Sequence, residues 1–212
     1  KTKELVNMGM CDCLQKLRDY VFLCEFYDEH LTLQSDPNLQ ETLQSMETED
    51  IQIMMERIDE QIEICQSVPS WHVCGIFFLE ISAARNKVEN WLQMSRKMLR
   101  ELVPYVYTFH ANAFYIDVLR VTNAIETPFG VLEDYVETVR SYRTAVENKE
   151  KYDNRYFHTQ SIVSLIEDSN IEHNFESSQL SLHLGPAWYH LQDAMSAFDD
   201  NMNEISKLCA TE

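Results

Sequence analysis

Glycine and proline are scarce in this sequence of 212 residues, which holds four of the first and five of the second. The glycines stand at positions 9, 75, 130 and 185. A phosphate-binding loop, a dinucleotide-binding turn and the nucleophile elbow of hydrolases each need two glycines within about six residues, so none of these motifs can be written here. The lack of turn residues is typical of long helices with few connections.

Positive charge is scarce as well. The 17 lysines and arginines are outnumbered by 35 aspartates and glutamates, which leaves a formal net charge of −18. Such a chain repels a nucleic-acid backbone and an anionic membrane, so we expect neither as a partner. Both a solvated acidic exterior and a basic protein partner fit this charge.

The six cysteines form no Cys-x-x-Cys pair, and no Asn-x-Ser/Thr site occurs. This pattern favours a reducing, intracellular compartment without disulfides. We predict no signal peptide, because the first apolar run stops after two residues. We predict no membrane span either, because the longest apolar stretch, residues 102–119, contains Pro104, His110 and Asp117. The sequence lacks an initiator Met and stops inside a heptad pattern, so we expect it to be part of a longer protein.

Metal and catalytic motifs are also missing. None of the seven histidines has an acidic residue three positions before it, so the Glu-x-x-His pairs of a di-iron bundle are absent. Cys11 and Cys13 would lie about 200° apart on a helix, which separates them as metal ligands. His183 and His190 share a helix face, either as a pH-sensitive pair or as ordinary exposed or core-edge histidines. We therefore predict no catalytic, cofactor-binding or metal site, and no cofactor.

Hydrophobic spacing predicts long helices in the first half of the chain. We expect one over residues 5–33, ended at Pro37, and a second over residues 39–66. Residues 71–81 differ, because they are dense in aromatic and branched side chains and contain Gly75. We interpret them as an extended segment or short strand threaded across the bundle, with a buried helical start as the alternative.

The second half is expected to be helical throughout. Ser82 is a predicted N-cap for a helix that Pro104 kinks or interrupts before it resumes to about residue 124. Thr127-Pro128 is a predicted start, and a helix continuing from there to Asp168 would be about 57 Å long. The last helix is expected to begin between residues 175 and 186, with Gly185-Pro186 as its start or a kink.

A heptad seam marks this last helix, because apolar residues recur at alternating steps of four and three. A second apolar feature is a dense aromatic cluster without interleaved basic residues, which we interpret as core or as a hydrophobic docking face. The seam comprises Leu184, Trp188, Leu191, Met195, Phe198, Met202 and Ile205, and the cluster comprises Tyr105, Tyr107, Phe109, Phe114 and Tyr115.

These patterns predict an all-α fold, an elongated bundle of long amphipathic helices with one short extended segment near 71–81. We divide the chain into three parts. Residues 1–70 form a helical hairpin of the bundle, 71–126 the extended segment plus a kinked helix, and 127–212 a long helical hairpin.

Two segments carry a family resemblance. Residues 73–101, VCGIFFLEISAARNKVENWLQMSRKMLRE, place a glycine in an apolar extended run and a helix after it. Residues 127–195 contain PFGVLEDYVETV, then SIVSLIEDSNI, then the Trp188-x-x-Leu191 helix, in that order. Together they resemble the tail of dynein heavy chains, of the axonemal (ciliary) type, just ahead of the linker. Gly185-Pro186 departs from the pattern of that family, and residues 1–66 carry no signature of it.

The resemblance implies a function. The parent chain would be an ATP-driven, microtubule-based motor whose ATPase modules lie elsewhere. This segment would be a non-catalytic, force-transmitting tail part leading toward the linker, in the cytoplasm and cytoskeleton of the cilium or flagellum axoneme. Its partners would be other dynein heavy, intermediate or light chains and the rest of its own heavy chain. The alternatives are a standalone spectrin-like or tethering module that binds a partner helix along the seam, and an acidic all-α enzyme.

Overall fold

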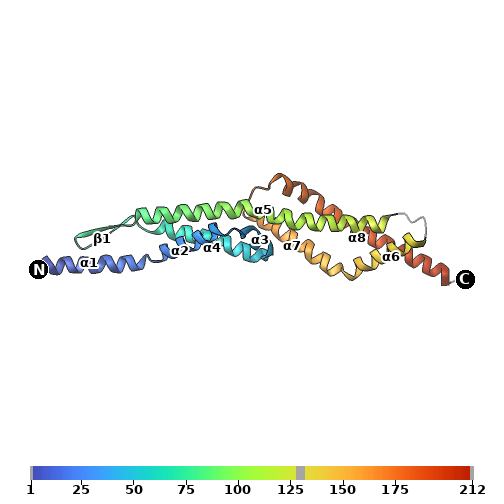
Figure 1. The fold of residues 1–212 in the computed structure, drawn as a ribbon, viewed down its shortest axis with the longest axis horizontal. Helices are drawn as coiled ribbons and strands as arrows, with labels where there is room; N and C mark the ends of the chain where they lie inside the picture. The colour runs from blue at the N-terminus through green and yellow to red at the C-terminus, as the bar shows by residue number, and fades with distance from the viewer. Residues whose placement is uncertain (1, 128–131, 211–212) are drawn as a thin grey trace. The chain divides into compact units, whose positions relative to one another are not determined.

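The computed structural model describes the backbone of residues 2–127 and 132–210 and the side chains of residues 2–127 and 135–202. The all-α fold is confirmed, since the described chain is helical apart from its connections and one two-stranded sheet (Figure 1). The chain divides into two compact units, residues 1–102 and 103–212. Helix α5, Ser82–Glu126, contributes residues to both units. The three-part division of the sequence stays a prediction.

The first unit begins with α1 (Thr2–Asp19) and α2 (Phe22–Ser35), so the prediction of one helix over residues 5–33 is wrong. The chain turns at Tyr20 and Val21, whose backbone N–H groups donate to the carbonyls three residues earlier, at Leu17 and Arg18. The Tyr20 hydroxyl hydrogen-bonds to Nε2 of His72, and the two rings stack. This contact joins two residues that lie far apart in the sequence. It coincides with the break between α1 and α2, where the sequence has no proline or glycine. Helix α2 ends before Asp36-Pro37, as predicted.

The predicted helix over residues 39–66 is also divided, into α3 (Leu39–Ser45) and α4 (Thr48–Ser67). Met46 and Glu47 between them are extended, with ψ angles of 151° and 154°. The break accompanies full burial of Leu43 before it and Ile51 after it. Burial of both side chains outweighs the local preference for a continuous helix.

Residues 71–80 form an antiparallel hairpin of β1 (Trp71–Cys74) and β2 (Phe77–Glu80), beside α1 (Figure 1). The extended segment is confirmed, although it folds back on itself instead of crossing the bundle as one strand. Gly75 makes the turn with φ +62°, a left-handed conformation that suits glycine. A second glycine, Gly9, lets α1 approach the hairpin, because a Cβ there would lie 2.9 Å from the Cys74 carbonyl oxygen.

Helix α5 passes through Pro104 without interruption, so of the two expected outcomes, a kink or an interruption, the interruption does not occur. Proline in a helix interior removes one hydrogen bond and costs about 3 kcal/mol. Val103, Val106 and Tyr107, which flank Pro104, are fully buried, and their packing offsets that cost. The hydroxyl of Thr108 donates to the Pro104 carbonyl.

The second unit continues with α6 (Leu132–Glu147), α7 (Lys149–Asp168) and α8 (Phe175–Ala210). The helix does not continue unbroken to Asp168, because the chain turns at Asn148, whose side-chain amide donates to the Thr144 carbonyl. The predicted start at Thr127-Pro128 falls on Pro128, which lies outside the described residues. Helix α8 begins at Phe175 and runs continuously through Gly185-Pro186.

The core of the second unit is aromatic and includes most of the described heptad seam. Leu184, Trp188 and Leu191 of α8 are buried, and the Trp188 ring packs against Phe114 of α5 and Tyr156 of α7, at centroid distances of 5.6 and 5.7 Å. Further along the seam Phe198 is buried and Met195 and Met202 are half-buried. The side chain of Ile205 lies outside the described residues. No helix in the described part of the chain is long and apolar enough to cross a membrane.

Candidate interaction sites

A groove of about 930 Å³ opens between α2 and α4 in the first unit. Its walls are largely apolar, its rim carries acidic side chains, and none of its lining residues belongs to α5. The apolar lining consists of Leu31, Leu33, Met46, Ile53, Met54 and Ile58, and the charged lining consists of Glu29, Asp36, Asp50 and Arg57. The long, flexible side chains of the two methionines can adapt to the shape of an occupant.

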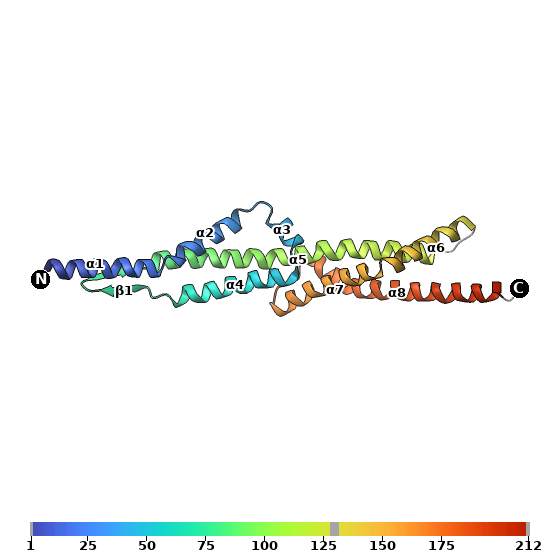
Figure 2. The same ribbon diagram turned by 90° about the horizontal axis from the view of Figure 1, so that it is seen from below.

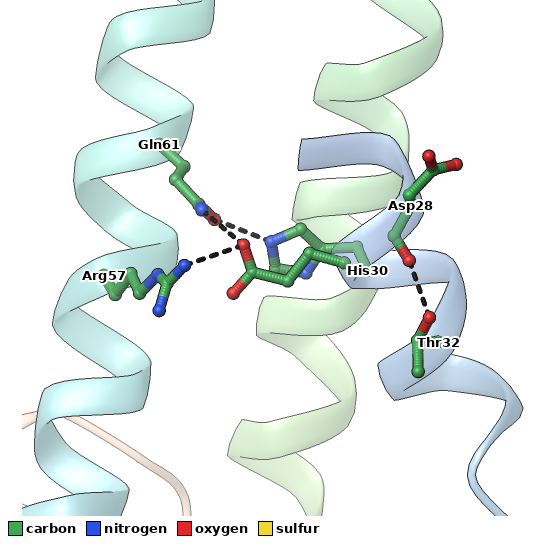
Figure 3. A network of polar contacts seen from close by, with 6 residues as sticks. Asp28, His30, Thr32, Arg57 and Gln61 are labelled. Carbon is green, nitrogen blue, oxygen red and sulfur yellow. Dashed lines mark hydrogen bonds and ion pairs between the residues drawn. The ribbon is translucent and has the colours of Figure 1, made fainter. Parts of the chain in front are cut away.

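A polar network fixes the two walls of this groove to each other (Figure 3). Buried His30 of α2 hydrogen-bonds through Nε2 to Oε1 of Gln61 on α4, at 2.7 Å. The Gln61 side-chain nitrogen donates to the Glu29 carboxylate at 3.0 Å, and Arg57 donates to the same carboxylate oxygen at 3.0 Å. Because the Gln61 oxygen must accept, Nε2 of His30 is the donor and carries a proton. Among the described residues, Nδ1 has no hydrogen-bond partner.

A second candidate region consists of exposed apolar side chains on α1 and on the hairpin. The outward side chains of the hairpin include Trp71, which is 59% exposed, and Phe78, which is 75% exposed, and their rings make an edge contact. Helix α1 adds Leu5 and Met8, both more than half exposed. Gly9 is the one buried residue of this helix that the structure describes. Exposed apolar side chains that gather on a protein surface mark interaction sites.

The cysteines and histidines singled out in the sequence stay apart in the structure. Cys11 is exposed, whereas Cys13 lies against the hairpin, where burial and the neighbouring Cys74 thiol raise the pKa of its own thiol. His190 lies 3.1 Å from a carboxylate oxygen of Glu126, and His183 is exposed on α8. Over the described ranges, no three His, Cys, Asp or Glu residues gather where they could hold a metal ion.

The predicted aromatic cluster divides between core and surface. Tyr107 and Phe114 are fully buried, while Tyr105 and Phe109 are about half exposed. Burial raises the pKa of Tyr107 to about 12, and Tyr156 nearby adds to the shift. The Tyr107 hydroxyl is buried without a hydrogen-bond partner in the described part of the chain. This residue therefore belongs to the core, and no docking face includes it.

The groove between α2 and α4 was missed by sequence reasoning. Its residues come from two helices and the connections around α3, and no fixed spacing relates Glu29 and His30 to Arg57 and Gln61. The hydrophobic pattern also gives no sign of the break that divides α3 from α4, so the sequence offered no signal for this groove.

Neither a protein-family model nor a curated protein matches this chain.

Proposed function

We propose that this chain is a non-catalytic, force-transmitting tail segment of a dynein heavy chain, ahead of the linker. The observation that carries the proposal is the set of exposed apolar side chains on α1 and the hairpin. Trp71, Phe78 and Met8 are each more than half exposed. Exposed apolar side chains are costly in water, and they suit a segment that neighbouring parts of a larger assembly cover.

Two further features support the proposal. The first segment that resembles dynein tails, residues 73–101, runs from β1 through the hairpin into α5, and the second spans α6, α7 and the first half of α8. Helix α5, Ser82–Glu126, has 45 residues and is continuous through Pro104. A long continuous helix suits a part that carries load.

The proposal includes the properties of the suspected parent. That parent would be an ATP-driven motor of the cilium or flagellum axoneme, with its ATPase modules in another part of the chain. The segment itself would act as no enzyme. Its partners would be other dynein heavy, intermediate or light chains and the rest of its own heavy chain.

The test is the sequence of the parent protein, obtained from transcripts or by peptide mapping of the purified native protein. We expect several Walker-type ATP-binding motifs downstream of these residues, in a chain of thousands of residues. An open reading frame that closely brackets the 212 residues would refute the proposal.

The alternative, a standalone spectrin-like module that binds a partner helix along the heptad seam, has less support. Leu184, Trp188 and Leu191 of the seam are already buried within the second unit. Further along α8, Asp199 accepts a hydrogen bond from Tyr142 of α6, and Met202 accepts one from Tyr135. The described part of the seam is therefore largely occupied by the chain's own helices.

A further inference from the structure

The first unit contains three helices that contact one another in pairs. Figure 2 shows α2 and α4 beside α5, and Figure 3 shows the side chains that join α2 to α4. Helix α2 contacts α5 through Gln34, whose side-chain amide donates to Ser95 at 2.8 Å. Helix α4 contacts α5 through the ion pair of Asp59 with Arg96, at 2.9 Å. Helices α2 and α4 are joined by the His30–Gln61 hydrogen bond. The groove lined by α2 and α4 without α5 therefore lies where a fourth helix would complete a bundle.

The dimensions and walls of the groove suit a helix better than a small molecule. From Asp50 to Ile58 the lining of α4 extends about 12 Å, which matches two to three turns of a facing helix. Ile53 in this lining is 60% exposed, and Leu31 on the opposite wall is 38% exposed. Pockets for small ligands enclose most of the ligand surface. Exposed apolar walls on two neighbouring helices instead suit an added helix. Apolar side chains spaced by three and four residues along that helix can pack between the walls.

The charges around the groove indicate the charge of a helix that would bind there. Among the described residues that line the groove, Arg57 is the one lysine or arginine, and its guanidinium already pairs with Glu29 at 3.0 Å. Asp36 and Asp50 also line the groove, and within the described ranges neither takes part in an ion pair. The rim is therefore complementary to lysine or arginine. A second copy of this chain would bring another net charge of −18, which opposes self-association here.

We propose that the groove between α2 and α4 binds a basic amphipathic helix of another protein chain. Apolar side chains of that helix enter between Ile53, Met54 and Leu31, and its lysines or arginines lie near Asp36 and Asp50. The inference rests on the proposed role of the chain as a part of a protein assembly, and it names the chemistry of one partner.

The binding test uses the full 212-residue chain and a defined probe. The probe is a synthetic 18-residue helix with leucines along one face and lysines beside them, labelled for fluorescence anisotropy. The chain offers matched controls on the same helix. Ile53→Arg adds a charge inside the groove, and Ile64→Arg adds the same charge at an exposed isoleucine that does not line it. Asp50→Lys and Glu49→Lys form a second pair, since both residues are exposed in the first turn of α4.

We expect Ile53→Arg to weaken probe binding at least tenfold and Ile64→Arg to change it less than twofold. Asp50→Lys should weaken binding by threefold or more relative to Glu49→Lys, although both change the net charge equally. Equal losses within each pair would show non-specific attraction to an acidic protein and would overturn the proposal. Circular dichroism of each variant shows whether it is folded.

A second measurement needs no variant. In the ¹³C-methyl NMR spectrum of the wild-type chain, the probe should shift the signals of Met46 and Met54, which line the groove. The signal of exposed Met94 on α5 should stay in place. Shifts at Met8 and Met10 of α1 with none at Met46 and Met54 would overturn the proposal. So would shifts of Met46 and Met54 that appear with rising protein concentration alone, which would identify a second copy as the occupant.

The results separate this inference from the proposed function. Failure of the probe to bind, in a chain whose parent carries the ATPase modules, refutes the groove alone. Specific binding, in a chain whose parent lacks them, refutes the dynein assignment and leaves the groove as a partner site.

Discussion

Trp188 shows how much one side chain contributes to the second unit. Its ring is buried against Phe114 and Tyr156. We expect Trp188→Ala to lower the free energy of unfolding by about 3–5 kcal/mol, because it removes a large buried aromatic and leaves a cavity. The control is Trp71→Ala, which removes an exposed ring. An unchanged melting temperature for Trp188→Ala in thermal unfolding would contradict the assignment of this residue to the core.

Tyr107 gives a prediction about alkaline pH. Burial raises its pKa to about 12, from an ordinary value of 10.0. Below pH 10 the phenol is neutral in both the folded and the unfolded chain, so its contribution to stability is fully present. As the pH rises from 10 to 12 the unfolded chain loses this proton first, which favours unfolding by about 1–3 kcal/mol.

Replacing Tyr107 by phenylalanine tests this directly. Tyr107→Phe should reduce the loss of stability between pH 10 and 12 in urea-unfolding series. At pH 7 it should be neutral or slightly stabilising, because the hydroxyl has no hydrogen-bond partner in the described chain. Tyr105→Phe, at a half-exposed position, should leave the wild-type pH curve unchanged. A large destabilisation by Tyr107→Phe at pH 7 would mean that the hydroxyl is bonded.

At the scale of the elements, the contact of α1 with the hairpin depends on Gly9. Alanine is the better helix former by about 1 kcal/mol, so local propensity favours Gly9→Ala. A Cβ at Gly9, however, would lie 2.8 Å from the Phe77 ring and 2.9 Å from the Cys74 carbonyl oxygen. We expect a net loss of about 1–2 kcal/mol, together with faster hydrogen exchange over residues 71–80.

The control for Gly9→Ala is Asn7→Ala, on the same helix. Asn7 is exposed, so this substitution raises helix propensity without placing a methyl group against the hairpin. Asn7→Ala should leave hydrogen exchange in the hairpin unchanged. Equal stabilisation by both substitutions would show that α1 does not pack closely on the hairpin.

The end of α7 is fixed by a short backbone motif. Asn170 has φ 52°, the Ile171 N–H donates to the Ile166 carbonyl at 2.8 Å, and the Asn170 N–H donates to the Glu167 carbonyl at 3.0 Å. These are the two hydrogen bonds of a Schellman motif, with Ile171 and Ile166 both buried. Asn170→Gly should raise the free energy of unfolding by about 0.5–1 kcal/mol, and Asn170→Ala should lower it by about 1 kcal/mol. Chemical denaturation measures both, and the opposite order of the two variants would contradict the motif.

The elements also show which features the sequence could predict. Gly75 and the dense apolar run around it correctly indicated an extended segment, and Pro37 correctly marked the end of α2. The turns at Tyr20 and Asn148 have no glycine or proline, and the turn at Tyr20 goes with the hydrogen bond from that residue to His72. Hydrophobic spacing records burial along one helix. It does not record a contact that a distant segment makes, and the groove between α2 and α4 was missed for the same reason.

At the scale of the whole molecule, the charge imbalance is the dominant electrostatic property. With a net charge of −18, most acidic side chains repel their neighbours, which destabilises the compact state. A few ion pairs act in the opposite direction, such as that of Arg155 with Asp117 at 2.8 Å. Salt weakens both effects, since the screening length falls from about 30 Å at 0.01 M to about 8 Å at 0.15 M. The sign of the salt effect therefore shows which of the two is larger.

We expect repulsion to be the larger effect, so sodium chloride should stabilise the chain. Raising its concentration from 10 to 300 mM at pH 7.5 should add about 1 kcal/mol, which corresponds to a melting temperature about 2–4 °C higher. The control is the same series near pH 5, close to the isoelectric point of about 4.7, where the repulsion and hence the salt effect should shrink. A melting temperature that falls with salt at pH 7.5 would show that pairs such as Arg155–Asp117 outweigh the repulsion. In that case a basic partner would compete with these internal pairs for the acidic side chains.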